Sequence, residues 1–171
     1  MAELLSALGR RLGLVTADSK DRLAGVYQRP EVVLVHAHAK TTAGVYLVEQ
    51  PAIRLDSRPT PVEVGAAVRQ ALGEFRTGVA HPSSSEWGGA GKPFLTAAGF
   101  RSWRTLEDGA RMLRVTQKAD GSFLFSITLN GGTRGDKKGF QGSGAPDQRL
   151  AAGASDAELG SAVLKALESC E

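Results

Sequence analysis

The feature that most constrains this chain is an internal repeat. The segments Ile53–Phe75 (IRLDSRPTPVEVGAAVRQALGEF) and Gln148–Cys170 (QRLAAGASDAELGSAVLKALESC) align without a gap at an offset of 95 residues, with eight identities in 23 positions. Similarity at a fixed offset indicates a duplicated structural unit. The 171 residues therefore have to bury two copies of one unit, and a chain of this length is expected to form a single domain.

Both copies carry the signature of a helix N-terminus. Thr60 with Glu63, and Ser155 with Glu158, match the S/T-x-x-E capping box. In this motif the hydroxyl accepts from a backbone amide of the first turn and the glutamate reaches back to the cap. We therefore expect a helix to begin at the residue that follows each hydroxyl.

Apolar residues then recur at the i, i+3, i+4, i+7 spacing of a helix with one buried face. Cys170 takes the position of Phe75 in this pattern, which favours a buried apolar thiol over a nucleophile. Gly65 and Gly160 also recur, although glycine costs a helix about 1 kcal/mol relative to alanine. We expect the helix backbone to approach a sheet closely at these glycines.

Strand patterns precede each helix. Runs rich in β-branched and aromatic residues, bounded by turn residues, predict three strands per half, and the sequence ADGS at 119–122 predicts a hairpin. The expected fold is α+β, with duplicated β-β-β-α units whose antiparallel sheets pack with two helices, Whirly-like by analogy. The expected strands are Glu31–Ala39, Gly44–Gln50 and Ala52–Asp56, then Ala110–Lys118, Ser122–Asn130 and Asp147–Ala151.

The predicted organisation is one domain, 1–171, in four parts. Residues 1–30 form an N-terminal extension, 31–76 the first half, 77–109 a structured connection and 110–171 the second half. Within the connection, the sequence KPFLTAAGF predicts a short helix that begins at Pro93 and ends near Gly99, and Ser102 can cap another. In the extension, Leu4, Leu5, Leu8 and Leu12 fall at helical spacing.

Composition narrows the class of protein. The net charge of +3 arises from interspersed charges rather than from a basic arm, so nucleic-acid binding is permitted but not indicated. The single cysteine excludes an internal disulfide framework, and no apolar run approaches the length of a membrane span. The acidic residue ahead of the first apolar run argues against a signal peptide. We expect a cytoplasmic protein without a membrane partner.

Candidate chemistry is sparse. His36 and His38 share one face of a predicted strand, where a metal site is possible but two histidines on a half-exposed sheet face are favoured. The sequence HPSSSEW at 81–87 places a histidine near serines, yet it lacks a nucleophile elbow and is typical of a capping turn. The stretch NGGTRGDKKGF at 130–140 fits neither a phosphate loop nor a dinucleotide fingerprint. We expect no catalytic residue, cofactor or metal.

Several of these segments together resemble a known family. RTGVAHPSSSEW at 76–87, KPFLTAAGFRSWRTLEDGA at 92–110, the NGG and KKGF pieces, and the ending SDAELGSAVLKALESCE resemble immunity proteins of bacterial contact-dependent growth inhibition (CDI) systems, formerly an uncharacterised bacterial domain family. The resemblance covers about 32–171. It implies a non-enzymatic cytoplasmic inhibitor that binds the C-terminal toxin domain of a delivered toxin, commonly a nuclease acting on RNA such as a tRNase.

An inhibitor of this kind should recognise its partner through exposed loops and charged rims. An alternative is a single-stranded nucleic-acid-binding protein, in which Trp87, Trp103 and Phe140 would stack bases beside basic side chains. Within the first hypothesis we expect 130–140 to be a partner-reading loop. The partner-binding candidates are His81, Glu86, Trp87, Lys92, Arg134, Asp136, Lys137 and Lys138.

Overall fold

The computed structural model describes residues 20–171, which form an α+β fold with a largely antiparallel sheet, as the sequence predicts. The leucines Leu4, Leu5, Leu8 and Leu12, which fall at helical spacing in the sequence, lie outside the described residues. The strands are β1 (Arg22–Arg29), β2 (Val32–Thr41), β3 (Tyr46–Leu55), β4 (Arg76–Val79), β5 (Arg111–Gln117), β6 (Phe123–Asn130), β7 (Phe140–Gly142) and β8 (Gln148–Leu150). The helices are α2 (Pro61–Gly73), α3 (Lys92–Ala98), α4 (Trp103–Glu107) and α5 (Asp156–Glu168).

The sheet reflects the duplication. Its strand order is β3-β2-β1-β5-β6-β7, with β4 added in parallel to β2 and β8 antiparallel to β6. The antiparallel pair β1 and β5 joins the halves at the centre, with Val26 opposite Leu113. From this pair each half runs outward through a second strand, β2 or β6. The third position is held by β3 on one side and by the short strands β7 and β8 on the other.

Several features of the strands differ from the sequence prediction, which includes neither β4 nor β7. Arg22–Arg29, assigned by sequence to the extension, forms β1 in the middle of the sheet. The two strands predicted on either side of Pro51 are one continuous strand, β3. Each half therefore has one hairpin, β1–β2 in the first half and β5–β6 in the second. By their positions in the sheet, β2 of the first half is equivalent to β6 of the second. The hairpin predicted at 119–122 is confirmed between β5 and β6.

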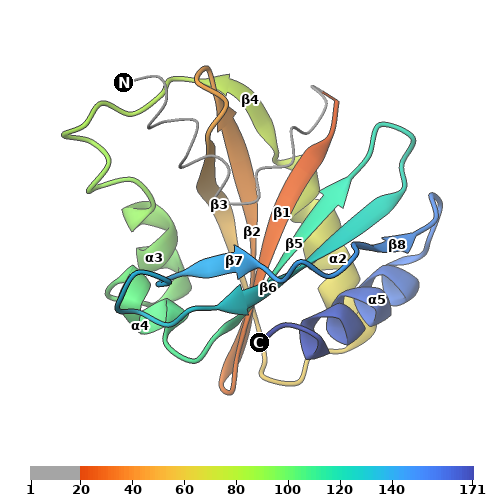
Figure 1. Ribbon diagram of the computed structural model, residues 1–171. Coiled ribbons are helices and arrows are strands. Elements are labelled where there is room, and N and C mark those ends of the chain that lie inside the picture. Colours follow the sequence, from red (N-terminus) through yellow and green to blue (C-terminus); the bar gives the residue numbers. More distant parts are fainter. Residues whose placement is uncertain (1–19) are drawn as a thin grey trace.

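The predicted helix starts are confirmed. At α2, Thr60 Oγ1 accepts from the Glu63 amide at 3.3 Å and the Thr60 amide donates to the Glu63 carboxylate at 2.7 Å. Ser155 and Glu158 form the same pair of bonds at α5, at 3.2 and 2.7 Å. Figure 1 shows the two helices side by side on one face of the sheet.

The prediction that the repeated glycines face a sheet is wrong, because they face the opposite helix. A Cβ on Gly65 would overlap the backbone carbonyl of Asp156, and one on Gly160 would overlap the carbonyl of Pro61. Each glycine thus lies against the first residue of the other helix. Arg69 strengthens the contact between the helices by donating from Nε to the Asp156 carboxylate at 2.6 Å.

Between these helices and the sheet lies the larger core. It contains alternate residues of the four central strands, such as Val26, Val35, Val115 and Phe125, and the apolar faces of α2 and α5. Cys170 is fully buried in it, as the repeat predicts, and burial raises the pKa of its thiol.

A second core lies on the opposite face under α3 and α4 (Figure 1). Phe94 and Leu106 of these helices pack against Tyr27 and Leu34 of the sheet. The helix α3 ends at Gly99, whose φ of 79° is left-handed, and Ser102 caps α4, so both predicted short helices are confirmed. The two layers of helices therefore cover opposite faces of one sheet.

Candidate functional site

The structure places the nominated residues in two segments. His81, Glu86 and Trp87 belong to the segment 80–91 between β4 and α3, and Lys92 begins α3. Arg134, Asp136, Lys137 and Lys138 belong to the loop 131–139 between β6 and β7. All eight side chains are exposed. In Figure 1 both segments lie on the side of the sheet that carries α3 and α4.

The segment 80–91 is a compact turn rather than a catalytic arrangement. The amide and the hydroxyl of Ser83 both donate to Glu86 Oε2, at 2.8 and 2.7 Å. These bonds lower the pKa of the Glu86 carboxyl. Backbone bonds from Glu86 and Trp87 back to the Ser83 carbonyl close the turn. The sequence interpretation of HPSSSEW as a capping turn is confirmed.

His81 and Trp87 meet across this turn. Their rings are in edge-to-face contact, with centroids 5.3 Å apart. On its other side His81 Nδ1 lies 3.3 Å from Thr41 Oγ1 at the end of β2, which ties the turn to the sheet. Trp87 nevertheless keeps 42% of its surface exposed. An exposed tryptophan held by a neighbour is a common anchor in protein interfaces.

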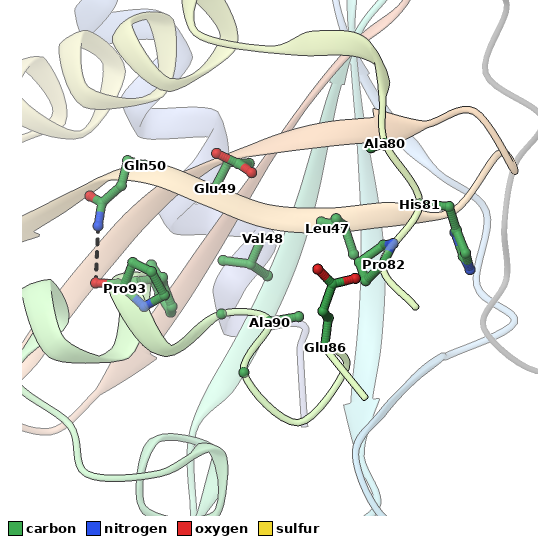
Figure 2. A pocket seen from close by; sticks show the side chains of 13 residues that line it. Leu47, Val48, Glu49, Gln50, Ala80, His81, Pro82, Glu86, Ala90 and Pro93 are labelled. Carbon is green, nitrogen blue, oxygen red and sulfur yellow. Dashed lines mark hydrogen bonds between the residues drawn. The ribbon is translucent and has the colours of Figure 1, made fainter. Parts of the chain in front are cut away.

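A pocket of about 340 Å³ separates this turn from strand β3 (Figure 2). Of the nominated residues, His81 and Glu86 line it. Sequence reasoning missed the wall contributed by β3, because that strand is about thirty residues away in the chain and no local motif links the two. The lining residues are Leu47, Val48, Glu49, Gln50, Ala80, His81, Pro82, Glu86, Gly89, Ala90, Gly91, Pro93 and Phe94.

Gln50 fixes the distance between the two walls of this pocket. Its Nε2 donates to the Pro93 carbonyl at 3.0 Å, and its Oε1 accepts from the Ala52 amide at 3.0 Å. Figure 2 shows the first of these bonds joining β3 to the start of α3. Glu49, the neighbouring residue, forms an ion pair with Arg76 at 2.8 Å.

The loop 131–139 is closed by its own backbone. The Gly131 amide donates to the Gly139 carbonyl and the Gly139 amide donates to the Gly132 carbonyl, each at 2.8 Å. Asn130 anchors the base of the loop, because its Nδ2 donates to the carbonyls of Glu107 and Ala110 at 2.8 Å each. The conformation of the loop is therefore set by these hydrogen bonds and does not depend on the charged side chains that project from it.

The two histidines of β2 lie next to each other, and His36 is buried against the second core. His36 is 2% exposed, which corrects the expectation of a half-exposed sheet face. Its ring stacks on that of Tyr27, with centroids 5.4 Å apart, and also contacts the ring of Phe94, with centroids 5.1 Å apart. Burial lowers the pKa of His36 to about 4. His38 is half-buried, and burial together with His36 lowers its pKa well below the usual value. Within residues 20–171 no group of three or more histidine, cysteine or acidic side chains could hold a metal ion.

The aromatic platform needed for nucleic-acid binding is not assembled. Trp103 stacks on Phe94 with centroids 5.7 Å apart and packs against the second core, as a core anchor does. Phe140 makes an edge contact with Tyr27 at 5.6 Å in the same core. Of the three rings proposed to stack bases, Trp87 is exposed, whereas Trp103 and Phe140 are half-buried.

Comparisons with known proteins find a similar fold but no similar sequence. No protein-family model matches the chain, and no curated protein matches it. A chain from a CdiA-CT/CdiI toxin and immunity complex of Yersinia pseudotuberculosis is similar with a TM-score of 0.70 and 14% identity, over 89% of this chain and 98% of that one. A protein of unknown function from Neisseria meningitidis is similar with a TM-score of 0.67 and 18% identity, over 92% of this chain and all of that one.

These structural similarities define the class of fold. The chain has the α+β architecture of a chain found in a CDI toxin and immunity complex, over most of the length of both. At these identities the likeness concerns the fold alone. Among residues 20–171, no helix is both long enough and apolar enough to cross a membrane.

Proposed function

We propose that this protein is an immunity protein that binds and neutralises the C-terminal toxin domain of a CDI system. The observation that carries the proposal is the similarity in fold to a chain of a CdiA-CT/CdiI toxin and immunity complex, which extends over nearly the whole of both chains. The sequence segments that resemble CDI immunity proteins first suggested the same class. The protein would act in the cytoplasm of the cell that produces the toxin, without catalysis of its own.

The surface that we assign to toxin binding is formed by the turn 80–91 and the loop 131–139. Arg134, Lys137 and Lys138 are exposed and outnumber Asp136, so the loop presents a net positive charge. Charged rims of this kind set the association rate and the choice of partner. Trp87 supplies an exposed aromatic anchor on the first segment. We propose that the toxin domain is a nuclease, commonly a tRNase in the family that the sequence resembles.

A growth assay tests the proposal. The toxin domain encoded immediately upstream is expressed from an inducible promoter in cells with and without this protein. Protection of growth, together with copurification of the two proteins, is the expected result. Continued killing in cells that contain the folded protein would rule out this toxin as its target. An immunity protein for a different toxin domain serves as the control for non-specific protection.

A further inference from the structure

The pocket between β3 and the turn 80–91 has a charge pattern that selects a particular occupant. We propose that it receives an arginine or lysine side chain of the protein partner, with the Glu86 carboxylate as the counter-charge. The identity of the partner rests on the proposed function. The preference of the pocket for a cation can be measured without that partner.

The walls of the pocket suit the stem of a long basic side chain. Apolar surface in the lining comes from Leu47 and Val48 of β3 and from Pro82, Pro93 and Phe94. Lysine and arginine bury their methylene groups on apolar surfaces of this kind while the charged head meets a polar partner. A volume of about 340 Å³ is near the lower end of ligand pockets, roughly 300–1,000 Å³, so it fits one side chain better than a folded element.

The charges around the pocket are acidic. Among residues 20–171, its lining includes Glu49 and Glu86 but neither lysine nor arginine. Glu49 is already paired with Arg76, and Figure 2 shows its carboxylate on the opposite side of β3 from Val48. Figure 2 also shows the Glu86 carboxylate directed toward Leu47 and Pro82, beside the apolar wall. Glu86 is therefore the acid available to an incoming cation.

Glu86 is held in place before any partner arrives. The amide and hydroxyl of Ser83 both donate to Oε2, which leaves Oε1 for a further bond. A fixed carboxylate loses little conformational entropy on binding. His81 lines the pocket and contacts Trp87, and their exposed rings offer the aromatic surface on which guanidinium groups stack. These features favour arginine over lysine.

The first experiment uses a small probe. The ¹⁵N-labelled protein is titrated with Nα-acetyl-arginine amide and, as a matched control, with Nα-acetyl-citrulline amide, which keeps the shape of the side chain but carries no charge. We expect saturable amide shifts at Leu47, Val48 and Glu86 with the arginine probe, in the millimolar range, and none with citrulline. Glu86→Gln should weaken the arginine response severalfold. Equal responses to both probes, or none to either, would overturn the proposal.

The second experiment uses the upstream toxin domain. Glu86→Gln should weaken its binding about tenfold, whereas Glu168→Gln, an exposed carboxylate on α5 beyond the other face of the sheet, should leave it unchanged. Ser83→Ala, which removes one of the two hydrogen bonds that hold the carboxylate but keeps its charge, should give an intermediate loss. Toxin binding that is insensitive to Glu86→Gln would exclude a basic side chain from this pocket. If the arginine probe binds but no toxin does, the proposed function fails and the cation preference stands.

Discussion

Gly65 and Gly160 occupy equivalent positions in the two repeated helices, and each lies against the backbone of the other helix at its first turn. This reciprocal contact explains why glycine recurs at a helical position where alanine is intrinsically better by about 1 kcal/mol. The duplication is thus held together at two places, by the β1–β5 pair in the sheet and by the glycine contact between α2 and α5.

We expect Gly65→Ala and Gly160→Ala each to lower the free energy of unfolding by about 2 kcal/mol or more. The added methyl would overlap a backbone carbonyl, and moving the helices apart costs more than the gain in helix propensity. Gly73→Ala is the matched control, because a Cβ at this last residue of α2 meets nothing within 4 Å. Urea denaturation measures the free energy of unfolding of all three variants. Unchanged stability in the first two variants would contradict the assigned contact.

The stability of the protein should depend on pH through His36. Burial lowers the pKa of His36 to about 4 in the folded protein, below its ordinary value of 6.5, so the unfolded chain binds the proton more readily. The stabilisation is complete above pH 6.5 and is lost as the pH falls from 6.5 toward 4, by about 3 kcal/mol at most.

The test compares the native chain with His36→Phe, whose ring does not titrate. Between pH 7 and about 4.5 the free energy of unfolding of the variant should fall less steeply, although His38 will leave part of the slope because its pKa is shifted in the same direction. Parallel pH profiles for the two proteins would show that His36 does not carry the dependence.

Asn130 should be essential for the position of the loop 131–139. Its Nδ2 satisfies the carbonyls of both Glu107 and Ala110, and its Oδ1 accepts from the Gly132 amide at 2.8 Å. Asn130→Asp keeps the acceptor but removes the donor and brings a carboxylate next to two carbonyls. We expect a loss of about 2–3 kcal/mol. Hydrogen exchange should rise at the Gly131 and Gly139 amides, and protection equal to the native protein would contradict this assignment.

The charges of the same loop should matter for binding and not for folding. Replacing Arg134, Lys137 and Lys138 by alanine leaves the backbone bonds that close the loop intact, so thermal unfolding should be unchanged. Toxin association should become about tenfold slower and less sensitive to salt. Lys165→Ala on α5 is the control. Unaltered association kinetics would contradict a role of the loop 131–139 in toxin binding.

The features that sequence could predict are those coded locally. The caps at Thr60 and Ser155 contain donor and acceptor within four residues, and the stripe that buries Cys170 follows from helical periodicity alone. The strand pattern that ends at Asn130 likewise predicts the start of the loop, but the short strand β7 that follows the loop at Phe140 is not predicted from sequence.

The features that sequence could not predict depend on contacts between distant segments. The place of β1 in the sheet depends on its pairing with β2 and β5, and a Cβ on Gly25 would overlap the His36 ring, so the fold requires glycine there. The partner of Gly65 was assigned to the sheet because periodicity shows that a face is buried but does not show against what. The pocket was missed because one of its walls is β3 and the other is the turn around Glu86.

The central claim is tested most directly by calorimetric titration of the purified protein with the purified toxin domain encoded upstream. The account predicts a saturable one-to-one complex with a dissociation constant in the nanomolar range, and loss of toxin activity in proportion to the complex formed. The absence of binding at tens of micromolar, with a toxin domain shown to be folded and active, would contradict it.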